Sequence, residues 1–138
     1  MTINGFTVGQ KAEEDVQVTD KMILEIAKVS NDYNPIHLSD EYSAKTPFGK
    51  RIAHGLVCEG LISNLIGTKL PGPGAIFINI SINFYKPVFI GDTITARGEI
   101  TEIIEHKSIM MINVDCFNQE NELVVGSISK VKLLDIVW

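Results

Sequence analysis

One short segment of the chain combines a carboxylate with an imidazole. Asp32 and His37 lie five positions apart and are separated by the pair Asn34-Pro35. Histidine titrates nearest neutrality, and a carboxylate is its common partner in proton transfer. Proline fixes its own φ and restricts the preceding residue, so this break allows the two side chains to converge. The spacing alone is more typical of a surface aspartate and a loop histidine that have no joint role.

A second candidate feature is the tripeptide Ala53-His54-Gly55, which begins a long apolar segment. A glycine at the start of a helix leaves its N–H unobstructed at the positive end of the helix dipole. Such a donor can stabilise an oxyanion that develops on a carbonyl group. A glycine that simply permits a turn is the alternative, and we expect His54 to be structural.

Two helices are predicted around the Asp32–His37 segment. Thr19 is a candidate N-cap, and apolar residues at helical spacing follow it as far as Ser30. The Asn34-Pro35 pair should stop any helix, which leaves His37 in a loop that Asn34 tethers through backbone hydrogen bonds. Ser39 can cap a second, short helix.

The segment from about Ala53 to Leu70 is nearly all apolar or small. A helix that is apolar almost all round is a buried helix. Gly60 and Gly67 reduce its helix propensity by roughly 1 kcal/mol each. Close approach of a neighbouring backbone or of a ligand would explain why they are tolerated.

Strands are predicted after this helix. Residues 76–84 alternate between apolar and polar types, and three further runs follow at 93–104, 108–117 and 123–134. Residues 118–121 form a hairpin loop between the last two runs. The order indicates an α+β fold with an antiparallel sheet wrapped around the buried helix. Because one sheet around one helix leaves an edge open, we expect a homodimer.

Composition narrows the class of protein. A chain of 138 residues fits a single domain over residues 1–138, with 45% hydrophobic and 21% charged residues. The net charge of −5 argues against nucleic acid as the main partner, although local cations could still bind one phosphorylated ligand. Cys58 and Cys116 lack metal-ligand spacing and are expected to be reduced thiols of a cytoplasmic protein. No signal peptide or membrane span is expected.

These motifs together carry a specific resemblance. The pattern Asp-x-Asn-Pro-x-His at Asp32–His37, followed by Ala53-His54-Gly55, resembles the MaoC-like (R)-specific enoyl-CoA hydratases. Phe84-Tyr85-Lys86-Pro87-Val88 and Gly91-Asp92 are similar to a strand and turn of that family. The resemblance extends from about Thr7 to Leu134. Asn31 departs from it, because the family usually has Gly or Ser before the aspartate.

The resemblance implies a fold, a site and a reaction. The fold would be the hot-dog fold, as a homodimer in which acyl chains enter near the subunit interface. Asp32 and His37 would be the catalytic pair, the Gly55 N–H would donate to the thioester oxygen, and Ser63 would line the acyl pocket. The reaction would be reversible hydration of the 2,3-double bond of a short- to medium-chain enoyl thioester. Neither a metal nor a redox cofactor would be needed.

Substrate contacts outside this centre are also expected. Asn34 is a candidate for substrate binding, and Lys50, Arg51 and Lys86 are candidates for the coenzyme A phosphates. Ordinary solvated charges are the alternative for the three cations.

Two other functions remain open at this point. A thioesterase of the same fold would hydrolyse the thioester and usually places a carboxylate on the buried helix, where Glu59 lies. A module that binds acyl thioesters without turnover is the second alternative. A thioester of acyl-carrier protein could replace one of coenzyme A as the substrate.

Overall fold

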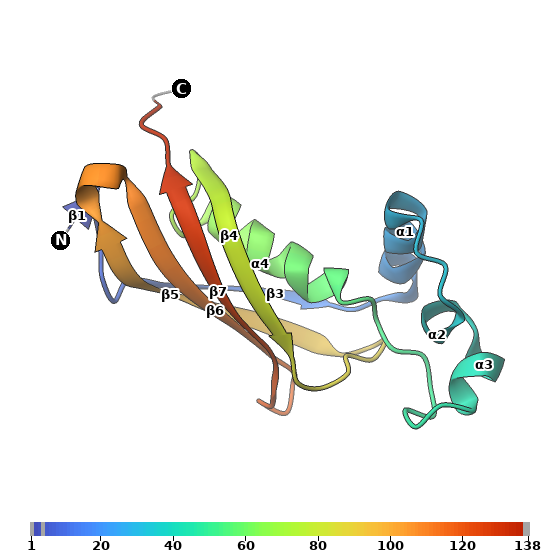
Figure 1. Ribbon diagram of the computed structural model, residues 1–138. Coiled ribbons are helices and arrows are strands. Elements are labelled where there is room, and N and C mark those ends of the chain that lie inside the picture. Colours follow the sequence, from blue (N-terminus) through green and yellow to red (C-terminus); the bar gives the residue numbers. More distant parts are fainter. Residues whose placement is uncertain (1, 4, 137–138) are drawn as a thin grey trace.

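A five-stranded antiparallel sheet with one long helix across its face forms the body of the protein in the computed structural model (Figure 1). The structure describes residues 2–3 and 5–136. In chain order the elements are β1 (Thr2–Ile3), β2 (Phe6–Thr7), β3 (Lys11–Gln17), α1 (Asp20–Ser30), α2 (Pro35–Leu38), α3 (Asp40–Ala44), α4 (Leu56–Thr68), β4 (Ala75–Phe84), β5 (Thr93–Ile104), a 3₁₀ turn (Glu105–Lys107), β6 (Ile109–Phe117) and β7 (Leu123–Leu133). The strand order in the large sheet is β3-β5-β6-β7-β4.

The helix caps predicted from the sequence are confirmed. The Thr19 side chain accepts a hydrogen bond from the Met22 N–H at 3.2 Å and begins α1. The Ser39 side chain accepts one from the Tyr42 N–H at 3.1 Å and begins α3. These bonds satisfy amide groups that lack partners within a helix. The helices α1, α2 and α3 lie together beyond the N-terminal end of α4 (Figure 1).

The prediction that His37 lies in a loop is wrong. Asn34 caps the short helix α2, its side chain accepting a hydrogen bond from the Ile36 N–H at 3.2 Å. Pro35 then occupies the first helical position, where the missing N–H has no cost and the fixed φ already suits a helix. The Asn-Pro pair thus separates α1 from α2 and begins α2, which places His37 on a rigid turn of helix.

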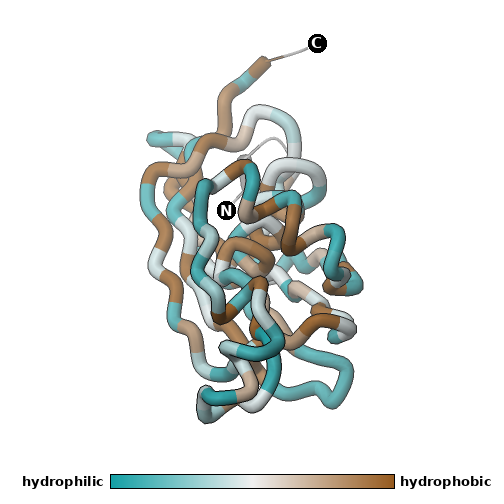
Figure 2. The backbone as a smooth tube through the Cα atoms, turned by 90° about the vertical axis from the view of Figure 1, so that its right-hand side faces the viewer, coloured by the Kyte–Doolittle hydropathy of each residue, from teal (hydrophilic) through white to brown (hydrophobic). Residues whose placement is uncertain are grey.

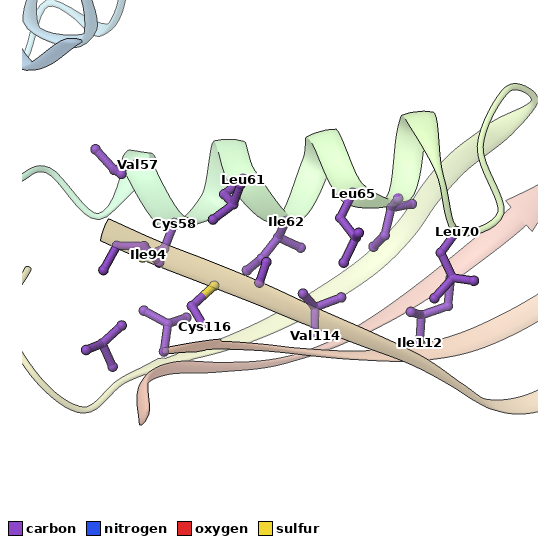
Figure 3. Close-up of a cluster of buried hydrophobic side chains, with 14 of the residues drawn as sticks. Val57, Cys58, Leu61, Ile62, Leu65, Leu70, Ile94, Ile112, Val114 and Cys116 are labelled. Carbon is purple, nitrogen blue, oxygen red and sulfur yellow. The ribbon is translucent and has the colours of Figure 1, made fainter. Parts of the chain in front are cut away.

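The buried helix is α4, and its inner face forms the core with the sheet. Leu61, Ile62 and Leu65 point from α4 toward Ile112 and Val114 of β6 (Figure 3). The close approach predicted at Gly60 and Gly67 is not found among the described residues, because nothing lies within 4 Å of a Cβ built at either glycine. Both glycines lie on the exposed side of α4.

The four predicted strands are confirmed as β4 to β7, but β3 was not predicted. It pairs antiparallel with β5, from Lys11 opposite Glu99 to Gln17 opposite Thr93. Its sequence, KAEEDVQ, is mostly charged, which is typical of an edge strand. Few apolar residues mark its inner face, so the period-2 signal of the sequence is weak there.

The other edge of the sheet is β4, whose one partner strand in the described part of the chain is β7. Hydropathy alternates along the strands (Figure 2). The exposed large apolar side chains of β4 are Ile76, Phe77, Ile78, Ile80 and Phe84.

Among the described residues, no helix is both long and apolar enough to cross a bilayer.

Candidate active site

The turn between α1 and α2 positions Asp32. Asn31 ends α1 with a φ of 63°, a left-handed conformation that Asn tolerates better than most residues. This explains how Asn31 can replace the smaller residue of the resembling family. Asp32 Oδ1 accepts a hydrogen bond from the Asn34 N–H at 3.1 Å, and the Asp32 N–H donates to Ser30 Oγ at 3.1 Å. The aspartate is therefore fixed through both its backbone and its side chain.

Asp32 and His37 face each other. The Asp32 Oδ2 and His37 Nε2 atoms lie 3.9 Å apart, with the aspartate side chain 47% exposed and the histidine largely buried. His37 Nδ1 lies 2.8 Å from the Ile52 carbonyl oxygen. Because that oxygen can only accept, Nδ1 carries the proton, and in the neutral form of the ring the lone pair of Nε2 faces the carboxylate.

The space between these atoms suits one water molecule. A water that donates one hydrogen bond of about 2.8 Å to each of two acceptors spans a separation of roughly 4 Å. Asp32 Oδ2 and His37 Nε2 offer two such acceptors, 3.9 Å apart. The oxygen of this water would keep its lone pairs for attack on a third group.

Gly55 precedes the first residue of α4 and is exposed. Its N–H donates no hydrogen bond within the part of the chain that the structure describes. A Cβ built on Gly55 would lie 2.9 Å from Cε1 of Phe84, so the aromatic ring rests directly against the glycine. Within the described structure, the start of α4 thus presents an amide that has no hydrogen-bond partner, at the positive end of the helix and beside the Phe84 ring.

A cavity of about 480 Å³ joins these groups. Its lining is mainly apolar, with the histidines and one lysine as polar members: His37, Phe48, Ile52, Ala53, His54, Gly55, Cys58, Phe84, Tyr85, Lys86, Pro87, Val88 and Val125. Asp32 lies beside this lining, across from His37. Such a pocket suits an apolar chain attached to a polar reacting group.

His54 contacts both members of the pair, which the sequence did not predict. Its ring stacks on His37, with 3.9 Å between centroids and 28° between planes. Its Nε2 lies 3.0 Å from the backbone oxygen of Asp32. The position next to Gly55 was visible in the sequence, but the contact with residues of another element was not.

The side chains of Asp32, His37 and His54 lie close enough to be considered as metal ligands, with ligand atoms within 4.8 Å of one another. One nitrogen of each ring already faces a backbone carbonyl. The other nitrogen of His54, Nδ1, is buried, and the two rings stack with 3.9 Å between centroids. The donor set therefore fits a proton-transfer site better than a metal centre.

The three cations proposed for phosphate binding lie in different surroundings. Lys50 stands over the Phe89 ring at 4.4 Å, and Lys86 bonds to Glu122, which lowers the pKa of that carboxyl. Both lysines border one polar hollow of about 340 Å³ next to the main cavity. Arg51 instead donates from Nε to the His37 carbonyl oxygen at 2.7 Å and from a terminal nitrogen to Asp20 at 2.6 Å.

Of the other residues singled out from the sequence, Cys58 contributes to the lining of the main cavity, whereas Ser63, Glu59 and Cys116 do not. Ser63 is exposed on α4, two turns beyond Gly55, and Glu59 is half-buried on the same helix. Neither lines the cavity around His37 in the described structure. Cys58 and Cys116 are free and buried against each other in the core (Figure 3).

The apolar wall of the cavity was missed by sequence reasoning. Phe84 and Val88 lie within a segment that was compared only as a strand and turn motif, and Val125 belongs to the opposite hairpin. The aromatic pair before Lys86 was the available signal, since exposed aromatic residues at a strand end often line a binding surface.

Comparison with known proteins shows which proteins this chain resembles. The model of the MaoC like domain family matches residues 5–121. An (R)-specific enoyl-CoA hydratase of Aeromonas caviae is 37% identical over 133 residues, covering 96% of this chain and 99% of the relative. A 3-hydroxybutyryl-CoA dehydratase of Methylorubrum extorquens is 40% identical over 117 residues, covering 85% of this chain and 74% of the relative.

The solved structures agree with the fold. The (R)-hydratase of Aeromonas caviae, described as involved in PHA biosynthesis, superposes with a TM-score of 0.92 at 36% identity. The match covers 96% of this chain and 100% of that structure. The predicted hot-dog fold is thereby confirmed.

Proposed function

Because this chain belongs to the family of MaoC-like domains, we propose that it is an (R)-specific enoyl-CoA hydratase. It adds water reversibly across the 2,3-double bond of a short- to medium-chain enoyl thioester. Relatives named as enoyl-CoA hydratase or 3-hydroxybutyryl-CoA dehydratase, at 37% and 40% identity, support this activity. The observation that carries the proposal is the pair of acceptors, Asp32 Oδ2 and His37 Nε2, 3.9 Å apart near the start of α4.

The thioester carbonyl accepts a hydrogen bond from the Gly55 N–H. As water adds to C3, negative charge moves onto this oxygen to form an enolate, which the positive end of α4 stabilises. Removing one donor of this kind typically lowers a rate by about 10²–10³. The ring of Phe84 against Gly55 limits the space in which the thioester can lie.

The attacking water lies between Asp32 and His37. Its oxygen bonds to C3 while one of its protons passes to the carboxylate of Asp32. His37 orients the water and helps to pass the proton held by Asp32 on to C2, which completes the addition and returns both groups to their starting states. The two groups share these protons as a coupled pair, and general acid–base help of this kind contributes about 10²–10⁴ in rate. The reverse sequence dehydrates a 3-hydroxyacyl thioester.

The rest of the substrate follows from the surroundings of this centre. The acyl chain occupies the apolar cavity of about 480 Å³, and the coenzyme A phosphates lie toward Lys50 and Lys86. Asn34 and Ser63 remain proposed substrate contacts, and Arg51 remains a proposed phosphate contact although its guanidinium already bonds to two protein groups. An acyl-carrier-protein thioester would use the same cavity with a different outer contact.

A direct assay tests the activity. The purified protein is mixed with crotonyl-CoA, and the loss of absorbance of the conjugated enoyl thioester is followed. Chiral analysis of the product should give the R isomer of 3-hydroxybutyryl-CoA. Release of free thiol without loss of the alkene would instead identify a thioesterase, and binding without either reaction would identify a non-catalytic module. Either of those results rejects the proposal.

The proposal includes a homodimer joined at β4. This strand ends the sheet with an unpaired edge, and five of its large apolar side chains are 38–55% exposed. Open apolar edges usually pair with another chain. Ile80→Lys should shift the protein from dimer to monomer in light scattering after gel filtration. Val8→Lys, an exposed site in the turn before the opposite edge strand, is the control and should stay dimeric.

We also place the protein in the cytoplasm. Cys58 and Cys116 lie together in the core and are free. Unpaired thiols are typical of reducing compartments. Fractionation of the source cells, followed by detection with a specific antibody, tests this location.

A further inference from the structure

His54 begins this inference as a buried side chain with a fixed backbone. It is 2% exposed and lies directly before Gly55. The Ala53 N–H donates to the Val88 carbonyl at 2.7 Å, and the His54 carbonyl accepts from the Val57 N–H at 3.0 Å. The backbone on both sides of His54 is therefore hydrogen-bonded, and the imidazole points toward the turn that carries Asp32.

The hydrogen bond to Asp32 assigns the tautomer of His54. Nε2 lies 3.0 Å from the Asp32 carbonyl oxygen, which can only accept, so Nε2 carries the proton. Nδ1 is buried and has no hydrogen-bond partner among the described residues. A lone pair in that position costs less than an unpaired N–H, which favours this tautomer.

The stack on His37 supplies a second constraint. The Nδ1 bond to Ile52 fixes one atom of the His37 ring but leaves the ring free to tilt about that bond. His54 lies against the face of the ring, with 3.9 Å between centroids, and blocks the tilt.

We propose that His54 is a positioning residue that holds both members of the hydration pair, Asp32 through its backbone oxygen and His37 through ring stacking. This role rests on the proposed hydratase function. It does not require His54 to exchange protons with the substrate. Loss of either contact moves one acceptor relative to the water between them, and small displacements of reacting groups can lower rates by about 10²-fold.

Two substitutions separate the two contacts. His54→Gln retains an N–H near the position of Nε2 and loses the ring, whereas His54→Phe retains the ring and loses the donor. With crotonyl-CoA, each should lower kcat roughly tenfold to 10²-fold and leave KM within about twofold. His106→Gln and His106→Phe are matched controls at an exposed histidine between β5 and β6, and both should retain wild-type kcat. Turnover within about twofold of wild type for both folded His54 variants overturns the proposal.

A measurement without turnover keeps the test independent of the assay. Long-range proton–nitrogen NMR of the resting protein distinguishes the tautomers of its three histidines, assigned with the His54 and His106 variants. His54 should be neutral with the proton on Nε2, and His37 should carry its proton on Nδ1. A proton on His54 Nδ1 overturns the proposal, even if the variants do not fold. Absence of hydration by the wild-type protein rejects the proposed function instead, and the tautomers still test the contacts.

Discussion

Asp32 Oδ2 and His37 Nε2 lie 3.9 Å apart, and both are hydrogen-bond acceptors toward the space between them. Asp32→Asn replaces one acceptor with an amide that can donate directly to His37, which displaces the shared water. His37→Gln removes the imidazole base. Each variant should lower kcat for crotonyl-CoA by at least about 10²-fold in the standard assay.

The control for this pair is Asp40→Asn, at an exposed carboxylate in the first turn of α3. It should keep wild-type kcat. All three variants should have the circular dichroism spectrum of the wild type. Wild-type turnover by a folded Asp32 or His37 variant would reject the assignment of the pair.

Gly55→Ala tests the amide at the start of α4. The added methyl group meets Phe84 Cε1 at 2.9 Å, so the ring or the helix start must move. We expect kcat/KM to fall by about 10²-fold, because the donor shifts relative to the developing oxyanion. Adding Phe84→Ala to this variant should restore part of the activity that Gly55→Ala loses, measured against Phe84→Ala alone.

Gly67→Ala is the matched control on the same helix. Nothing lies within 4 Å of a Cβ at Gly67, so Ala fits there and should raise the free energy of unfolding by roughly 0.5–1 kcal/mol. Its kcat should not change. Equal losses of activity in the Gly55 and Gly67 variants would argue against a specific role for the Gly55 amide.

The sequence predicted those elements in which short-range pattern determines structure. The cap at Thr19, the apolar helix α4 and the alternation in β4 are local signals, and the structure confirms them. β3 was not predicted from the sequence, because an edge strand needs few apolar residues. Its position in the sheet is set by pairing with β5. The Asn34-Pro35 pair was predicted to end a helix and leave His37 in a loop, but Pro35 begins α2. Proline ends one helix as readily as it begins the next.

The candidate site divides in the same way. Asp32 and His37 are close in sequence, so one local motif, Asp-x-Asn-Pro-x-His, singled out both. His54 bonds to Asp32 from 22 positions away, and Phe84 meets Gly55 from another element. Contacts of this kind depend on how the sheet and α4 pack, and no local period of the sequence records them.

Arg51 joins the backbone of His37 to α1. Its Nε donates to the His37 carbonyl at 2.7 Å, and its terminal nitrogen contacts Asp20 at 2.6 Å. Arg51→Lys keeps the charge but cannot make both bonds in the same geometry. It should lower kcat roughly tenfold by loosening α2. Asp20→Asn, which keeps the bond to His37, should have a smaller effect in the same assay; the reverse order would show that the ion pair matters more.

Lys86 forms an ion pair with Glu122 and also lines the polar hollow beside the active cavity. Lys86→Met should raise KM for crotonyl-CoA by up to about fivefold, as for loss of one exposed charge pair. Glu122→Gln frees the ammonium group and should lower KM. The control is Lys11→Met, on the opposite edge strand β3, which breaks the exposed ion pair between Lys11 and Glu99. If KM stays constant in the first two variants, Lys86 is not a phosphate contact.

Asp115 provides a test of stability outside the site. It lies opposite Arg97 in the ladder between β5 and β6, but that arginine bonds to Glu13 and Asn121. Burial raises the pKa of Asp115 above its ordinary value of 3.8. The protonated carboxyl therefore favours the folded state below pH 3.8, and this contribution is lost as the pH rises through the folded-state pKa.

Asp115→Asn removes this titration. The variant should have a higher free energy of unfolding than the wild type near pH 7, where the buried carboxylate is charged, and a smaller difference at about pH 3. Urea unfolding at both values measures the two differences. Glu102→Gln, at an exposed carboxylate on β5, should show no such dependence. A gain that is the same at both values would mean that the amide improves packing, because only the ionised carboxylate carries the cost of burial.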